Sequence, residues 1–134
     1  MADITPGTVK VGSTSAQVEV VTAGATITAG DCLYYNSATD KYLISDCTAA
    51  STDEVSRIAL SGGADDEPIA VMKPGQVINL GATLTVAEIY VLSVTGAIAP
   101  VADLASNDYV TIVGYGQSTS LLKFQPVATG FQVP

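Results

Sequence analysis

Gly24-Ala-Thr-Ile-Thr followed by Cys32-Leu-Tyr-Tyr returns later in the chain as Gly81-Ala-Thr-Leu-Thr followed by Ile89-Tyr-Val-Leu. Residue 24 corresponds to residue 81 and residue 32 to residue 89, so both parts of the motif share an offset of 57 residues. Each copy has a glycine turn, a Thr-rich approach and a strand that carries Tyr. A unit of this length that occurs twice predicts two related halves that close one sheet system.

The similarity continues more loosely downstream. In the second half, Gly96-Ala-Ile-Ala-Pro-Val corresponds loosely to Lys41-Tyr-Leu-Ile-Ser-Asp, and Ile112-Val-Gly-Tyr-Gly corresponds to Arg57-Ile-Ala-Leu-Ser-Gly. One departure stands out, because Ala29-Gly30-Asp31 is replaced by Val86-Ala87-Glu88. Since a side chain disfavours the left-handed backbone that Gly adopts, we expect the second turn to differ in geometry. The alternative to a true repeat is chance similarity in a sequence rich in Ala, Thr and Gly.

The whole chain has the pattern of an all-β protein. Gly, Pro, Thr and Ser interrupt each helical period before it reaches about 10 residues. Runs rich in β-branched residues and Tyr, separated by turn clusters, predict strands over residues 16–21, 32–36, 42–45, 55–60, 69–72, 76–80, 89–94, 109–116 and 121–126. Residues 48–54 and 101–107 are the two stretches where a helical turn is expected. Many short strands predict a small sandwich or barrel-like domain.

A length of 134 residues indicates one domain. We predict an extended N-terminal arm over residues 1–20, a β-domain over 21–125 and a C-terminal tail over 126–134. Pro and Gly residues prevent regular structure in the arm, which still keeps spaced apolar side chains. We therefore expect residues 2–15 of the arm to be poorly ordered alone and to become fixed on a neighbouring chain. The predicted partner-binding residues are Ile4, Val9, Val11 and Phe131.

The charge balance argues against several partners. Thirteen acidic and five basic residues give a net charge of −8, which repels a phosphate backbone. The five cations are scattered singly, so no basic cluster favours an anionic membrane. No apolar run approaches the ~20 residues of a membrane span, and the N-terminus lacks the pattern of a secretory signal. We therefore expect no nucleic acid and no membrane as partners, and synthesis in a cytoplasm.

Catalytic and cofactor-binding patterns are missing from the sequence. The chain has no His, so it cannot assemble Ser-His or Cys-His nucleophilic machinery. Cys32 and Cys47 have no neighbouring Cys with which to build a zinc site. A disulfide between them is conceivable if they lie on paired strands, but we favour free buried thiols. The acidic run at 65–67 is best explained as a solvated hairpin tip. We predict no catalytic residue, no metal and no cofactor, and the protein is not expected to be an enzyme.

The six tyrosines allow two interpretations. Exposed rings can form a stacking platform for sugars or for single-stranded nucleic acid. Most of these tyrosines, however, lie within apolar runs, and Tyr34 and Tyr35 must face opposite sides of a strand. Packing in the core or at an interface, with the hydroxyl at the boundary, is the interpretation that we favour.

Four segments together resemble the cement, or head-decoration, proteins of tailed bacteriophages. They are Val20-Val-Thr-Ala-Gly-Ala-Thr-Ile-Thr-Ala-Gly-Asp-Cys-Leu-Tyr, Ile58-Ala-Leu-Ser-Gly-Gly-Ala-Asp-Asp-Glu-Pro-Ile-Ala-Val, Leu80-Gly-Ala-Thr-Leu-Thr-Val and Tyr90-Val-Leu-Ser-Val-Thr-Gly-Ala-Ile-Ala-Pro. The resemblance covers residues 17–116 and consists of the order of turn residues and strands. It implies an all-β domain on the outer surface of the virion, which binds the major capsid protein and itself, as a homotrimer, and reinforces the head.

Two other functions compete with this interpretation. A tail-fibre or head-fibre module that binds a host-surface glycan would use exposed tyrosines and loop carboxylates. A small hydrolase based on paired carboxylates would lose turnover when single Asp or Glu residues are changed. Composition and motifs favour the cement protein over both.

Overall fold

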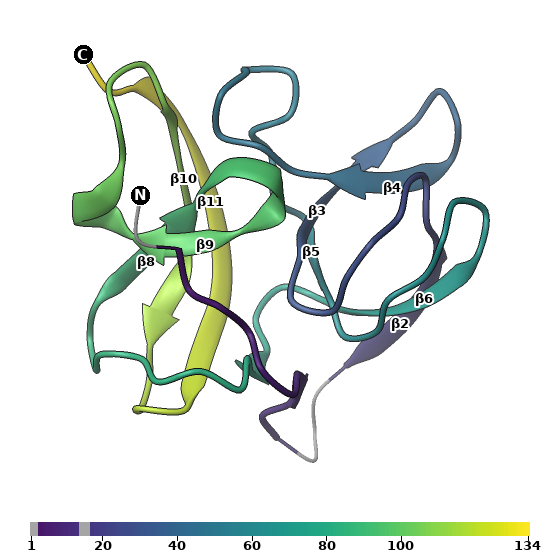
Figure 1. Ribbon diagram of the computed structural model, residues 1–134, viewed down its shortest axis with the longest axis horizontal. Helices are drawn as coiled ribbons and strands as arrows, with labels where there is room; N and C mark the ends of the chain where they lie inside the picture. The colour runs from purple at the N-terminus through teal and green to yellow at the C-terminus, as the bar shows by residue number, and fades with distance from the viewer. Residues whose placement is uncertain (1–2, 14–16) are drawn as a thin grey trace.

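The computed structural model describes residues 3–13 and 17–134, which form two antiparallel β-sheets packed as a small sandwich-like domain (Figure 1). This confirms the predicted all-β class. The five-stranded sheet contains β2 (Val18–Thr22), β3 (Cys32–Asn36), β4 (Lys41–Ile44), β5 (Arg57–Ala59) and β6 (Pro68–Met72). The six-stranded sheet contains β1 (Lys10–Val11), β7 (Val77–Asn79), β8 (Ile89–Leu92), β9 (Ile98–Pro100), β10 (Tyr109–Gly116) and β11 (Leu121–Gln132).

The two sheets have the same topology. The strand order is β2-β6-β5-β3-β4 in one and β7-β11-β10-β8-β9 in the other, with β1 added beside β7. The register follows the repeat as well, because the pair Leu33 and Arg57 recurs as Tyr90 and Gly114, each shifted by 57 residues. Strand order and register together confirm two related halves, and chance similarity no longer explains the repeated motif.

The turns before β3 and β8 also correspond, which corrects one expectation. The Gly30 N–H donates to the Ala59 carbonyl at 2.8 Å, and the Ala87 N–H donates to the Gly116 carbonyl at the same distance. Gly30 has φ +96° and Ala87 has φ +67°, so both residues are in the left-handed region. The prediction of a different second turn was therefore wrong. The hydrogen bond that both turns share holds Ala87 in a conformation that costs a side chain about 1–2 kcal/mol.

The five-stranded sheet curls until its edges meet. Ala23 and Tyr42 form a parallel bridge between the end of β2 and β4, and the Gly24 N–H donates to the Tyr42 carbonyl at 2.8 Å. The curled sheet encloses an apolar core of its own, made of Ala23, Ile27, Leu33, Ala59, Ile69 and Val71. Burial of these side chains stabilises the closed form of the sheet.

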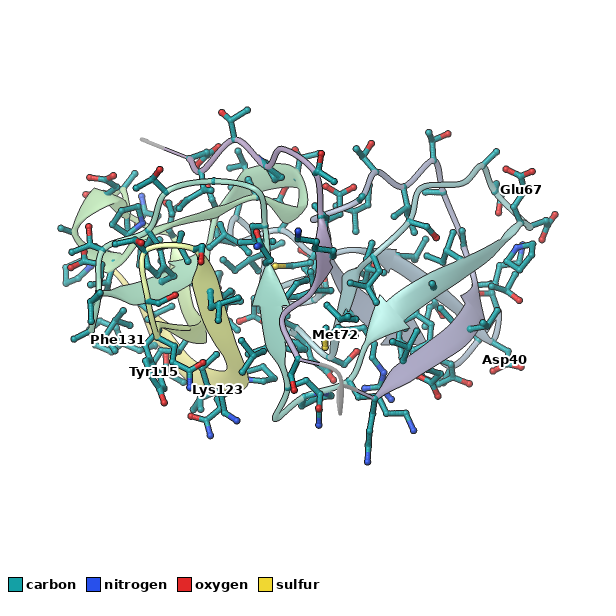
Figure 2. All side chains as sticks on the ribbon, turned by 90° about the horizontal axis from the view of Figure 1, so that it is seen from below. Asp40, Glu67, Met72, Tyr115, Lys123 and Phe131 are labelled. Atoms are coloured by element: carbon teal, nitrogen blue, oxygen red, sulfur yellow. The ribbon has the colours of Figure 1, made fainter. Side chains whose placement is uncertain are left out.

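A second core joins the two sheets. Side chains from the opposite face of the five-stranded sheet, including Cys32, Ile58 and Met72, pack with inner residues of the six-stranded sheet such as Leu122 and Phe124. Met72 lies near the middle of the molecule, between the two sheets (Figure 2). Neither Cys32 nor Cys47 forms a disulfide, and both are buried, as the sequence predicted.

Both ends of the chain are more regular than the sequence indicated. The predicted arm boundary at residue 20 falls inside β2, and β1 within the arm pairs with β7 of the same chain. The predicted tail boundary at residue 125 falls inside β11, because the second half of that strand continues to pair with β10 as far as Gln132. Residues 1–2 and 14–16 of the predicted arm lie outside the described residues.

Three smaller differences concern local structure. The sequence did not predict β1 or β9 as strands, and residues 48–54 form turns with no helix. The helical turn expected within 101–107 is present as a single 3-10 turn, Val101–Asp103, and another such turn covers Val94–Gly96. The short strands β1 and β9 depend on partners that are distant in sequence, which a local pattern does not reveal.

Candidate functional site

The four predicted partner-binding residues divide into two pairs. Ile4 and Val9 are half-buried and pack against the core that joins the sheets. The Ile4 N–H donates to the Ile98 carbonyl at 2.7 Å, so the arm is bound along its own six-stranded sheet. Val11 and Phe131 are 38% and 58% exposed. Val11 and Phe131 are therefore exposed, whereas Ile4 and Val9 pack within this chain.

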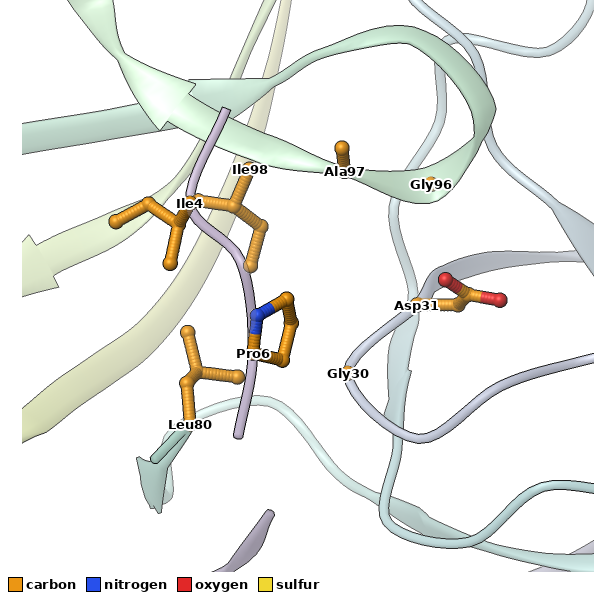
Figure 3. Close-up of a pocket in the computed structure, with 8 residues that line it drawn as sticks. All are labelled: Ile4, Pro6, Gly30, Asp31, Leu80, Gly96, Ala97 and Ile98. Carbon is orange, nitrogen blue, oxygen red and sulfur yellow. The ribbon is translucent and has the colours of Figure 1, made fainter. Parts of the chain in front are cut away.

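A small pocket marks the place where the arm crosses between the two halves (Figure 3). It lies between Ile4 and Pro6 of the arm, the Gly30 turn, and the segment from Gly96 to Ile98. Its volume of about 70 Å³ leaves room only for a few water molecules. Burial raises the pKa of the adjacent Asp31, although a backbone hydrogen bond from Thr28 lowers it. The pocket therefore serves the packing of the arm and has no space for an organic ligand.

Two large apolar side chains are exposed on the last part of β11. Phe131 and Val127 lie on the last part of β11 and are 58% and 52% exposed. Val127 lies opposite Ile112 of β10, and Phe131 lies opposite Val110. The Thr129 hydroxyl donates to the Val110 carbonyl at 2.6 Å, which fixes the irregular pairing between these residues. We term Val127 and Phe131 the β11 apolar end.

The opposite end of the molecule is acidic. Glu67 and Asp40 lie at one extreme of the view in Figure 2 and Phe131 lies toward the other. The hairpin tips that carry Asp40 and residues 65–67 meet there, and Lys41 forms ion pairs with Asp65 and Asp66. This position agrees with the predicted solvated hairpin tip. These hairpin tips therefore carry exposed carboxylates, whereas β11 contains no acidic residue.

The structure offers little for nucleophilic or metal chemistry. Burial, followed by the charges of Asp108 and Asp46, raises the pKa of the Cys47 thiol to about 12. Burial also raises the pKa of Cys32 far above its ordinary value. Neither sulfur therefore exists as a reactive thiolate near neutral pH. Among the described residues, no group of three or more His, Cys, Asp or Glu side chains is placed to hold a metal ion.

No protein-family model matches this chain, and no curated protein is significantly similar to it. Across residues 3–13 and 17–134, no helix is long and apolar enough to cross a membrane.

Proposed function

We propose that the protein is a capsid cement protein, which binds the outer surface of an assembled tailed-phage head and stabilises it. The sequence resemblance over residues 17–116 and the all-β fold support this proposal. The protein binds the major capsid protein and itself, as a homotrimer on the shell. No step of this function requires catalysis, a metal or a cofactor.

The observation that carries the proposal is the contrast between the two ends of the molecule. A side chain such as Phe131, with 58% of its surface exposed, gains about 1–2 kcal/mol when a partner covers it. The acidic end instead presents the carboxylates of Asp65 and Asp66, which are well solvated. The β11 apolar end therefore contacts the shell, and the acidic end faces the medium.

Binding of the purified protein to heads that lack it tests the proposal. We expect the full chain to co-sediment with such heads and to raise the temperature at which they release their DNA. Changing Phe131 and Val127 together to Ser should weaken retention at least tenfold, which corresponds to about 1.4 kcal/mol. Val20→Ser is the matched control, because Val20 is 70% exposed on the other sheet and lies outside the β11 apolar end.

Two outcomes would contradict the proposal in different ways. If the full chain does not bind undecorated heads, the cement function is wrong. If the full chain binds and the double variant, shown by circular dichroism to be folded, binds equally well, the β11 apolar end is not the contact surface. Equal weakening by Val20→Ser would place the contact on the five-stranded sheet instead.

A further inference from the structure

A polar cleft opens between β2 and the β3–β4 hairpin, beside the bridge that closes the curled five-stranded sheet. Its volume is about 310 Å³, and it is lined by residues 19–22 of β2 together with Tyr35, Asp40 and Tyr42. We term it the sheet-mouth cleft. Leu33 and Val71, which belong to the enclosed core, face the same side of the sheet as Tyr35 and Glu19. The cleft is therefore the solvent-accessible end of an otherwise apolar interior.

The side chains around this cleft form one connected series. Arg57 Nε donates to Glu19 Oε1 at 2.8 Å, and its guanidinium lies 5.9 Å from the centre of the Tyr42 ring. The Tyr42 and Tyr35 ring centres are 5.3 Å apart with their planes tilted by 54°. The Tyr35 hydroxyl donates to Asp40 Oδ1 at 2.6 Å. These contacts fix the two rings and two carboxylates before any ligand arrives.

The backbone of β2 adds hydrogen-bonding groups to the same cleft. The Ala23 N–H donates to the Glu67 carbonyl just before β6, and the Gln17 carbonyl accepts from the Lys73 N–H just after it. The backbone N–H and carbonyl groups of odd-numbered β2 residues therefore point toward β6. Gly24 instead donates toward β4, at Tyr42. Because backbone groups alternate along a strand, those of Val20 and Thr22 point to the cleft. The cleft thus presents backbone donors and acceptors beside its carboxylates.

The repeat supplies an internal comparison for this site. In the second half, Tyr35 corresponds to Leu92 and Tyr42 to Ile98, by their matching positions in the β3–β4 and β8–β9 pairs. Arg57 corresponds to Gly114. Leu92 and Ile98 are buried in the core that joins the sheets. The same place in the fold is therefore filled by apolar side chains in one half and opened by aromatic and charged ones in the other.

We propose that the sheet-mouth cleft binds a neutral saccharide of one or two sugar units. A tyrosine ring such as Tyr35, which is 43% exposed, packs against the C–H face of a sugar ring, and carboxylates accept hydrogen bonds from its hydroxyls. The volume lies at the lower end of the range for small-ligand sites, which suits a ligand of this size. This activity does not rest on the capsid-binding proposal.

Charge distinguishes a neutral sugar from other ligands. An anionic sugar would meet the carboxylate of Asp40, which repels it. A cationic side chain would compete with Arg57, which already pairs with Glu19 and lies near the Tyr42 ring. Arg57 and Glu19 neutralise each other, so the cleft keeps one carboxylate, that of Asp40, to accept hydrogen bonds from sugar hydroxyls. A neutral, hydroxyl-rich ligand fits this balance best.

The test is an NMR titration of the full-length, isotope-labelled protein with four neutral disaccharides: maltose, cellobiose, lactose and diacetylchitobiose. We expect at least one sugar to shift amide signals of residues 19–22 and 35–42, with a dissociation constant in the millimolar range or below. Tyr35→Ala should weaken this binding about tenfold. Asp40→Asn should weaken it several-fold, and Asn tolerates the positive φ of 56° at this position.

Matched controls separate loss of the site from loss of the fold. Asp65→Asn removes a carboxylate from the same acidic end but outside the cleft lining, and should leave sugar binding unchanged. If Tyr35→Ala shifts amide signals throughout the protein, Tyr35→Phe and Asp40→Asn replace it as the test variants. The absence of localised shifts with all four disaccharides overturns the proposal. Shifts at the same amides with a trilysine peptide, but with no sugar, would also overturn it and would assign the cleft to a cationic peptide.

Discussion

Gly114→Ala should destabilise the protein more than any other glycine-to-alanine change on a central strand of the six-stranded sheet. A Cβ atom at Gly114 would overlap the Lys123 carbonyl oxygen and lie 2.9 Å from its carbonyl carbon. An ordinary contact needs more than about 3 Å, so the backbone of β10 or β11 must move by about 1 Å. Overpacking of this kind costs about 1–3 kcal/mol, and weakened ladder hydrogen bonds add to it. We expect a loss of about 3 kcal/mol in the free energy of unfolding.

Urea denaturation followed by circular dichroism measures this loss, and a thermal melt should show a midpoint lower by about 10 °C. Gly75→Ala is the control, because Gly75 has φ +86° but no heavy atom would lie within 4 Å of an added Cβ. That change should cost only about 1 kcal/mol, from backbone strain. If Gly114→Ala costs less than Gly75→Ala, the close approach of β10 and β11 is refuted, and with it the register between these strands.

Two further predictions concern titratable side chains. Partial burial of Asp46 raises its pKa, but hydrogen bonds from Thr48 and from the Thr95 N–H outweigh this and hold the pKa below its ordinary value. The ionised Asp46 should therefore stabilise the fold at pH values above its pKa in the unfolded chain, and this contribution should be lost as pH falls through its pKa in the folded protein. Asp46→Asn should reduce the loss of stability at acidic pH in a stability-versus-pH curve. Because burial raises the pKa of Cys47 to about 12, native protein should react with iodoacetamide at pH 8 far more slowly than urea-unfolded protein, and equal rates would contradict this.

Local patterns were sufficient to predict most of the strands that lie in the core, with β9 as the exception. The predicted bounds 32–36 and 109–116 match β3 and β10. Both segments combine β-branched or aromatic residues with turn residues at their ends, so their propensity and their burial favour the same structure. The offset of 57 residues was also visible in the sequence, because the glycine turns and Tyr-bearing strands that define each half are local features.

The binding surfaces depended on contacts that the sequence does not display. The adjacent residues Tyr34 and Tyr35 look alike in the sequence, but only Tyr35 meets Tyr42 and Asp40 across the β3–β4 hairpin. Glu19 and Arg57 are 38 residues apart and meet beside the cleft because β2 and β5 both pair with β6. The favoured interpretation of the tyrosines as packing residues therefore describes Tyr90, which is buried, better than Tyr35.

The all-β class, the two halves and most strand positions follow from the amino-acid sequence, since they depend on the alternation of neighbouring residues and on the turn residues between strands. The structure of the chain ends depends instead on tertiary contacts. Ile4 and Val9 are covered by the six-stranded sheet, and the second half of β11 pairs with β10 although it contains Pro126 and Gly130. The physical reason is that ladder hydrogen bonds and burial come from segments distant in the chain, and they outweigh weak local propensity wherever such a partner is in reach.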